Sequence, residues 1–285
     1  MKNQHSNHLL LLTLATLLIS TSGTLGRFID LPTPVIIWWR ASLGALFLFL
    51  FVKYKKINLK IHSKKDFYTV LLSSIFLGAH WVTYFYALKL SNVALGMLSM
   101  FTFPVITTFL EPLFTNAKLS RIHIVLCLLV LLGIYILAPE FDFESAHLKG
   151  ILFGVFSAFC YAIRNLLLKK PAAIYNGTSL MMYQTTFVTI LLLPVLFFND
   201  TSNIATQYPY VILLGLITTA IGHSLFIGSL KYFSVSTASI IGSTQPIFGI
   251  IIAFFFLNEM PTFNTFIGGS LILATVVIES IRSRR

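Results

Sequence analysis

The chain has 285 residues, of which 56% are hydrophobic and 10% are charged, and its net charge is +11. Soluble domains are about 45–50% apolar and about 25% charged, so this composition indicates a membrane protein and argues against an ordinary soluble enzyme. The two cysteines, Cys127 and Cys160, each lie in an apolar run and offer neither a disulfide framework nor a metal-ligand spacing.

Ten hydrophobic runs have the length needed to cross a bilayer, because an apolar core about 30 Å thick requires about 20 helical residues. Short connections containing proline or glycine, such as Lys170-Pro171 and Asn176-Gly177, separate several of them. We therefore expect an all-α membrane protein with ten transmembrane helices. The predicted spans are 8–28, 34–52, 67–88, 92–114, 120–138, 149–168, 178–197, 208–230, 234–257 and 264–281.

The first hydrophobic run can also be interpreted as a secretory signal, because polar residues 1–8 precede the hydrophobic residues 9–19. No small-x-small cleavage site follows cleanly. In addition, Leu25-Gly26-Arg27 aligns with Leu167-Leu168-Lys169 at the end of the sixth run. We therefore predict a retained transmembrane helix.

Ionisable side chains in the second and third spans are candidate site residues, since burying a charge at mid-helix costs about 2.5–3.5 kcal/mol on the insertion scale. Arg40 either hydrogen-bonds a neighbouring helix or contacts solute. His80 and Tyr84 are four residues apart and share a helix face, with Trp81 beside them. We place His80, Trp81 and Tyr84 on the substrate pathway, and a histidine satisfied by structural hydrogen bonds is the alternative.

The fourth span contains a proline and a carboxylate. A proline within a helix removes a backbone donor and frees carbonyl groups, so Pro104 predicts a kink that lines the pathway, unless the kink serves packing alone. Glu111 is the one acid well inside a span, and protonation would reduce its cost of burial. It is the candidate for proton coupling, although its position near the inner interface also fits a solvated or ion-paired group.

The sixth span contains Arg164, which lies five residues before Lys169. Its long side chain can either snorkel to the interface or bind an anionic group. Tyr161 and Asn165 share its neighbourhood along the helix. Together the three side chains predict a carboxylate-binding patch on the pathway.

The eighth and ninth spans supply further predicted pathway residues, His223, Gln245 and Pro246. An offset of 142 residues aligns Pro246 with Pro104 and brings His223 within one residue of His80. Because the two histidines occupy nearly equivalent positions in the two copies, they are stronger candidates for the pathway than a single buried histidine would be.

Two stretches of the chain repeat each other at that offset. Each copy contains five predicted spans, an odd number, so the second copy enters the membrane upside down. Inverted repeats provide two halves that can rock against each other and expose a central site to either face. The matched pairs are Leu88-Lys89 with Leu230-Lys231, Val93 with Val235, Thr102 with Thr244, Pro104 with Pro246, Phe114 with Phe256 and Asn116 with Asn258.

Lysine and arginine gather in alternate connections, which places both termini in the cytoplasm by the positive-inside rule. The connection over residues 53–65 alone has six lysines, whereas Arg27, Lys89 and Lys149 fall on the other side. We interpret the basic residues as anchors to anionic lipid headgroups in a cell inner membrane, not as a nucleic-acid interface.

Motifs in both halves carry a family resemblance, which covers residues 9–280. They are the segments 222–226, 230–239, 245–248 and 257–261, preceded in the first half by Thr33-Pro34, Arg40, Tyr86-Ala87-Leu88 and Pro104. In these motifs the chain resembles the EamA family of the drug/metabolite transporter superfamily. The resemblance implies a ten-helix carrier whose cavity is formed mainly by helices 1, 3, 4, 6, 8 and 9.

One position departs from the family pattern. Glu259 follows Pro246 by thirteen residues, but Ala117 stands at that distance from Pro104. A role of the first-repeat glutamate in relatives therefore does not transfer to this chain. We divide the chain into a cytoplasmic N-terminus (1–8), a first EamA-like five-helix repeat (9–138), a second such repeat (149–281) and a basic cytoplasmic tail (282–285).

Motifs of ATP hydrolysis and of common catalytic sites are absent from the sequence, including the P-loop, Gly-x-Ser-x-Gly and His-Glu-x-x-His. We predict a secondary transporter, expected to be an exporter, of a small metabolite such as an amino acid or related amphipathic compound, working by alternating access with no cofactor or metal. The alternatives are a membrane-embedded enzyme or lipid-processing protein, and a structural membrane subunit. Expected partners are the lipid bilayer and a small-molecule solute. The sequence leaves open whether the chain forms a homodimer.

Overall fold

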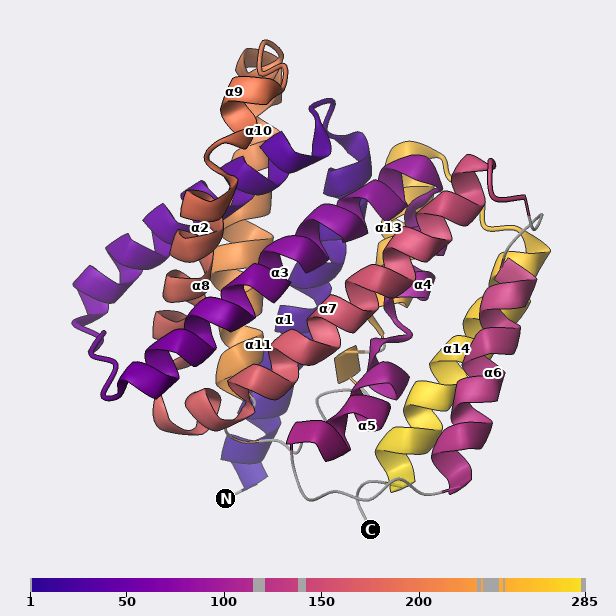
Figure 1. Cartoon of the computed structure of the whole chain (residues 1–285), viewed down its shortest axis with the longest axis horizontal. Helices are drawn as coiled ribbons and strands as arrows, with labels where there is room; N and C mark the ends of the chain where they lie inside the picture. The colour runs from indigo at the N-terminus through magenta and orange to yellow at the C-terminus, as the bar shows by residue number, and fades with distance from the viewer. Residues whose placement is uncertain are drawn as a thin grey trace.

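The computed structural model describes residues 2–114, 121–137, 142–229, 232, 241–242 and 244–282, and the regular elements in this part of the chain are all helices (Figure 1). The repeat matches at Asn116, Leu230-Lys231 and Val235, and the departure at Ala117, lie outside it. The first half contains α1 (Lys2–Phe28), α2 (Thr33–Lys55), α3 (Lys64–Leu90), α4 (Val93–Met100), α5 (Phe103–Phe114) and α6 (Arg121–Leu137). The second half contains α7 (Ala146–Ile174), α8 (Gly177–Leu192), α9 (Val195–Phe198), α10 (Ile204–Leu213), the π-helix η1 (Leu214–His223), α11 (Ser224–Ser229), α13 (Gln245–Leu257) and α14 (Phe263–Arg282).

Within the described residues, seven helical segments are long and apolar enough to cross a membrane. Three shorter apolar helices lie in the regions of the predicted fifth, ninth and tenth spans, and residues 234–240 and 243 of the ninth span lie outside the described part of the chain. The predicted all-helical membrane class is therefore confirmed. The seven long segments are Asn7–Phe28, Thr33–Lys55, Lys64–Leu90, Val93–Phe114, Ala146–Ile174, Gly177–Phe198 and Ile204–Ser229, and the shorter ones are Ile124–Leu137, Gln245–Leu257 and Phe263–Ile278.

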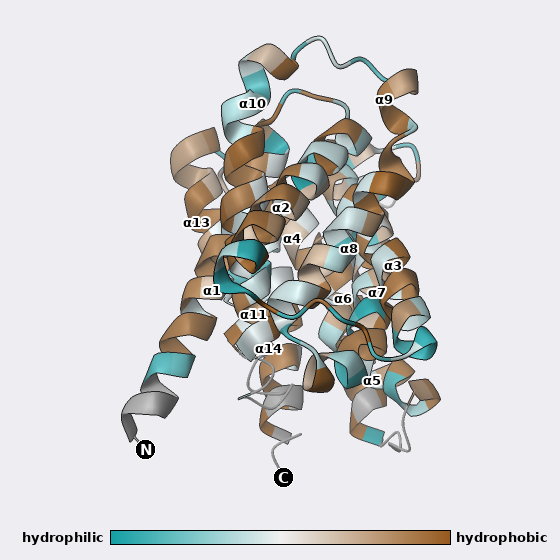
Figure 2. Cartoon of the chain, turned by 90° about the vertical axis from the view of Figure 1, so that its left-hand side faces the viewer, coloured by the Kyte–Doolittle hydropathy of each residue, from teal (hydrophilic) through white to brown (hydrophobic). Residues whose placement is uncertain are grey.

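Large hydrophobic side chains cover much of the outside of the bundle. Phe255 and Phe256 of α13, and Phe263 and Phe266 of α14, are 72–76% exposed. Figure 2 shows hydrophobic residues along most helices, with hydrophilic stretches in places such as the connection between α2 and α3. Exposed apolar surface on this scale is unfavourable in water and favourable against lipid.

Polar side chains fix where several helices begin. Ser63, Asn92 and Ser145 each accept a hydrogen bond from a backbone N–H three residues ahead, at the starts of α3, α4 and α7. A cap of this kind satisfies a donor that has no partner within the helix. At the other end of α13, Asn258 takes the left-handed conformation (φ 55°) that commonly ends a helix.

The fourth predicted span is interrupted rather than merely kinked. α4 ends at Met100, Phe101 and Thr102 form a turn, and α5 begins at Phe103, so Pro104 is the second residue of a new helix. Proline is tolerated there because the N–H groups of a first helical turn have no helical partner in any case. Pro246 has the same position in α13, which begins at Gln245.

Contacts between helices are preserved when the two halves of the chain are exchanged. The 142-residue offset aligns α1 with α7, α2 with α8, the α10–η1–α11 run with α3, and α14 with α6. The offset also aligns α5 with α13, so the extensive α3–α7 contact has its counterpart in α1–η1, α5–α7 in α1–α13, and α3–α8 in α2–η1. The α2–α8 and α6–α14 contacts each join equivalent helices, and Figure 1 shows α6 and α14 side by side.

Glycine allows the α6–α14 contact to be close. A Cβ atom added to Gly268 would lie 2.7 Å from the carbonyl oxygen of Gly133, and one added to Gly133 would lie 3.0 Å from that of Gly268. Small residues of this kind let helix backbones approach in lipid, where helix association depends on packing. The pair therefore holds α6 and α14 together.

Candidate functional site

Two arginines lie deep in the bundle, Arg40 on α2 and Arg164 on α7, and each is 1% exposed. Among the described residues, neither forms an ion pair with an aspartate or glutamate. A buried charge without a counter-charge is costly, so the polar groups around each arginine matter for function. We name these surroundings the Arg40 cluster (Arg40, Trp81, Thr219 and His223) and the Arg164 cluster (Tyr161, Arg164, Asn165 and Gln184).

The Arg40 cluster joins three helices. Arg40 Nε donates a hydrogen bond to Thr219 Oγ1 on η1 (2.8 Å), and Arg40 Nη2 lies 3.3 Å from His223 Nε2 at the end of η1. The guanidinium carbon stands 4.1 Å from the centre of the Trp81 ring on α3, a cation–π contact. The predicted alternative for Arg40, hydrogen bonding to a neighbouring helix, is what the structure shows.

A close approach of α2 and η1 positions this cluster. A Cβ atom added to Gly44 would lie 2.7 Å from Thr219 Cγ2, so glycine is needed one turn beyond Arg40. The η1 segment is a π-helix of 10 residues, a rare form that often occurs at functional sites, and it contributes both Thr219 and His223. Sequence analysis singled out His223 but missed Thr219, because a threonine in an apolar span carries no signal of its own.

In the Arg164 cluster, neutral amide oxygens accept from both amino groups of the guanidinium, while the buried Arg164 Nε has no hydrogen-bond partner among the described residues. Arg164 Nη1 donates to Asn165 Oδ1 (3.0 Å) and Nη2 donates to Gln184 Oε1 (2.5 Å). Gln184 in turn donates from Nε2 to Ser73 Oγ on α3 (2.9 Å). Arg164 therefore does not snorkel to the interface. Gln184 was not among the predicted pathway residues.

Helix α3 connects the two clusters through His80, which is adjacent to Trp81. His80 Nδ1 lies 2.7 Å from Ser157 Oγ on α7, and the His80 ring is 4.6 Å from that of Tyr161 and 6.0 Å from that of Tyr84. The structure thus brings together the predicted aromatic face of the third span. It also gives His80 a hydrogen-bond partner in Ser157 that the sequence did not predict.

The two predicted prolines, Pro104 and Pro246, lie in different places relative to the two arginine clusters. Pro104 is buried at the start of α5, where its neighbour Phe103 packs edge-on against Tyr161 at 4.9 Å. Gln245 and Pro246 begin α13, which packs against α1 and α4. The structure therefore places Pro104 beside the Arg164 cluster and puts Gln245 and Pro246 in neither cluster.

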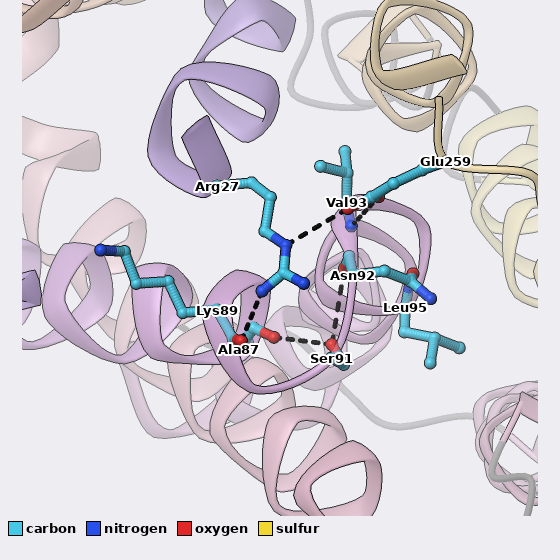
Figure 3. Close-up of polar contacts among 8 residues, drawn as sticks. All are labelled: Arg27, Ala87, Lys89, Ser91, Asn92, Val93, Leu95 and Glu259. Carbon is cyan, nitrogen blue, oxygen red and sulfur yellow. Dashed lines mark hydrogen bonds and ion pairs between the residues drawn. The ribbon is translucent and has the colours of Figure 1, made fainter. Parts of the chain in front are cut away.

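An ion pair ties the helices together at the end of the bundle where α1 finishes (Figure 3). Arg27 Nε contacts Glu259 Oε1 (3.3 Å), and Glu259 Oε2 accepts a hydrogen bond from the Val93 backbone N–H (2.8 Å). Arg27 Nη1 donates to the Lys89 carbonyl (2.5 Å), and Lys89 Nζ donates to the Leu31 carbonyl (2.6 Å). We call Arg27, Lys89, Val93 and Glu259 the Glu259 cluster.

A second ion pair lies towards the other end of the bundle. Glu111 of α5 accepts a hydrogen bond from Lys169 of α7 at 2.7 Å, so the ion-paired alternative for Glu111 is observed. Figure 1 shows α5 at the end where α1 begins. Arg27 and Lys169 are separated by the repeat offset of 142 residues, so each half supplies one basic partner.

Comparison with known proteins gives a family match in both halves. The model of the EamA-like transporter family matches residues 7–138 and again 148–281. An uncharacterized transporter, YxxF of Bacillus subtilis, is 24% identical over 98% of this chain and 91% of its own. The pseudopaline exporter CntI of Pseudomonas aeruginosa is 24% identical over 87% of this chain and 86% of its own.

One solved structure shares the fold. This crystal structure superimposes on the chain with a TM-score of 0.68 and covers 98% of both chains. Its sequence identity is 17%, so the likeness concerns the fold alone.

Proposed function

Because this chain belongs to the EamA-like transporter family, we propose that it is a secondary transporter that exports a small metabolite, such as an amino acid or related amphipathic compound. The family and its named relatives identify a membrane transporter, not an enzyme. The proposal comprises ten transmembrane helices in two five-helix repeats of opposite orientation, with both termini on the cytoplasmic side of an inner membrane. In support, α1 begins and α14 ends at the same end of the bundle (Figures 1 and 2).

The observation that carries the proposal is the exchange symmetry of the helix contacts. Among the described residues, the α3–α7, α5–α7 and α3–α8 contacts between the halves each have a counterpart with the roles of the halves reversed. When two halves are related in this way, each can adopt the conformation that the other half had. A central site that was open to one face of the membrane is then open to the opposite face. Such a fold supports alternating access.

The solute pathway in this proposal runs between the halves past the Arg40 and Arg164 clusters. The Arg40 cluster joins α2 and α3 of the first half to η1 of the second half. The Arg164 cluster lies on α7 and α8 of the second half and reaches Ser73 on α3 of the first half through Gln184. The pathway residues are His80, Trp81, Tyr84, Pro104, Tyr161, Arg164, Asn165, His223, Gln245 and Pro246.

The ion pairs near the two ends of the bundle serve as closures in this mechanism. Arg27–Glu259 joins α1 to the segment after α13, and Lys169–Glu111 joins α7 to α5, so each crosses between the halves. Protonation of Glu111 would remove its charge and weaken its hold on Lys169. A proton can thereby be coupled to opening at that end. The export direction draws on the exporter among the relatives.

Counterflow in liposomes that contain only this purified chain tests the proposal. Vesicles loaded with an unlabelled amino-acid mixture should transiently accumulate external labelled amino acids above equilibrium, whereas protein-free vesicles should not. Reversing the gradient then compares outward with inward movement. Flux equal to that of protein-free vesicles for every solute in a broad metabolite panel would overturn the proposal.

A further inference from the structure

Three polar atoms of the Arg40 cluster have no hydrogen-bond partner although they are screened from solvent. They are Arg40 Nη1, Trp81 Nε1 and His223 Nδ1. Arg40, Trp81 and His223 are 1%, 1% and 4% exposed. Buried polar groups in proteins are nearly always satisfied, and an orphaned one costs about 1–3 kcal/mol. Three orphans on mutually contacting residues indicate a group that is bound there during function.

The chemistry of these atoms defines what they lack. The guanidinium and indole N–H groups can only donate. Since Arg40 Nη2 donates towards His223 Nε2, that nitrogen must accept, and the proton of the neutral imidazole then lies on Nδ1. All three unpartnered atoms are therefore donors. The cluster lacks an acceptor, and it also lacks a negative charge.

The described part of the chain does not supply that charge. Its acidic residues are Asp30, Asp66, Glu111, Asp142, Glu144, Asp200, Glu259 and Glu279, all in connections or near helix ends. Within the described part of the chain, Arg40 contacts Thr219, His223 and the rings of Trp81 and Phe85. The buried guanidinium thus faces one hydroxyl and several aromatic rings, with no counter-charge.

We infer that the Arg40 cluster binds the carboxylate of the transported solute, with Arg40, Trp81 and His223 donating to its oxygens. The inference rests on the proposed function, because the screened atoms become accessible only when the surrounding helices separate. A carboxylate carries a single negative charge, which matches the one guanidinium of the cluster, whereas a phosphate dianion would keep a charge in excess. The faces of Trp81 and Phe85 provide apolar contact for the carbon atoms next to the carboxylate.

The Arg164 cluster provides the matched control. Both amino groups of Arg164 already donate to amide oxygens, so this arginine ties α7 to α8. Replacing Arg40 by methionine should remove carboxylate binding, yet leave the solute-free protein as stable as before or more so, since an uncompensated buried charge is lost. Replacing Arg164 by methionine should have the opposite effect on stability, which should fall because Gln184 Oε1 loses its donor.

The experiment uses the full chain in detergent and three matched probe pairs: acetate and acetamide, benzoate and benzamide, N-acetyl-L-leucine and N-acetyl-L-leucinamide. Trp38→Phe and Trp39→Phe leave Trp81 as the only one of the three tryptophans, so its fluorescence reports on the cluster. At least one carboxylate should change this fluorescence and raise the melting temperature in a saturable way, and its amide should not. Arg40→Met should weaken that binding at least tenfold, whereas Arg40→Lys should retain part of it.

Three results would overturn the inference: no carboxylate binds, the amides bind as well as the carboxylates, or Arg40→Met binds carboxylate like the parent protein. Failure of Arg40→Met to fold would also contradict it, since the variant is expected to be at least as stable. The assay needs no membrane, so its outcome is separate from counterflow. Binding without flux would refute only the transporter mechanism, and flux of neutral solutes without carboxylate binding would refute only the site.

Discussion

The two halves of the chain share their helix contacts but not their charges. Arg40 of the first half corresponds to Met182 in the second, and Arg164 of the second half corresponds to Ser22 in the first. The contacts of these helices nevertheless recur in exchanged form. The difference teaches that helix packing carries the symmetry between the halves, whereas the buried polar side chains do not follow it.

The two ends of the bundle also differ in the contacts of their charged side chains. Glu259 contacts both Arg27 and the Val93 backbone N–H, and its side chain is 21% exposed. Glu111 meets Lys169, with side chains 34% and 47% exposed. Exposed ion pairs contribute little to stability, and the Arg27–Glu259 pair is the less exposed of the two.

The largest loss of stability is expected from disrupting the packing of α4 against α7. A Cβ atom added to Gly154 of α7 would clash with Ser99 Oγ of α4 and lie 2.8 Å from Ser99 Cβ. Gly154→Ala should lower the free energy of unfolding by about 1–3 kcal/mol, because a well-packed contact has no room for the methyl group. Thermal unfolding in detergent measures this.

Gly228→Ala is the matched control, since nothing lies within 4 Å of a Cβ atom added there. Alanine favours helix over glycine by up to about 1 kcal/mol, so this variant should be unchanged or more stable. Equal destabilisation by both substitutions would show that the α4–α7 contact is not as tight as described.

The Arg164–Gln184 hydrogen bond should give the next largest effect. Arg164→Met leaves Gln184 Oε1 without its donor and should destabilise the protein by about 1–3 kcal/mol. A double-mutant cycle with Gln184→Met should give a coupling of about 0.5–3 kcal/mol between the two sites. Additive effects of the two substitutions would mean that the bond does not tie α7 to α8.

Glu259→Gln should cost less, about 1 kcal/mol, because the amide oxygen can still accept from Val93 while the charge facing Arg27 is lost. In transport assays, the weakened closure should let a thiol reagent added from the Glu259 end reach the interior faster. If the variant changed neither the stability nor the rate at which the thiol reagent reaches the interior, Glu259 would not be part of the closure.

Glu111→Gln should change stability least, by about 0.5 kcal/mol or less, since its ion pair with Lys169 is partly exposed. Its expected effect is on coupling: a pH gradient should no longer drive transport, while counterflow without a gradient persists. Gradient-driven transport at the parental rate would exclude Glu111 as the coupling group.

The sequence predicted where the described helices lie because each span is marked by its hydrophobic length, but it predicted a kink at Pro104 where the structure has a break between α4 and α5. It also predicted that Tyr161, Arg164 and Asn165 lie together, since residues three or four apart share a helix face. It did not predict the Arg40–Thr219–His223 arrangement. That arrangement depends on the π-helical geometry of η1 and on the close approach of α2, which no local pattern in the sequence encodes.

Labelling of single cysteines at repeat-equivalent positions tests the central claim most directly. In a background with Cys127 and Cys160 replaced by serine, Lys60→Cys and Ser202→Cys place one thiol each at exposed positions 142 residues apart. Two halves of opposite orientation predict that an impermeant maleimide labels Ser202→Cys in intact cells and Lys60→Cys only in inverted vesicles. Labelling of both thiols from the same side of the membrane would contradict the account.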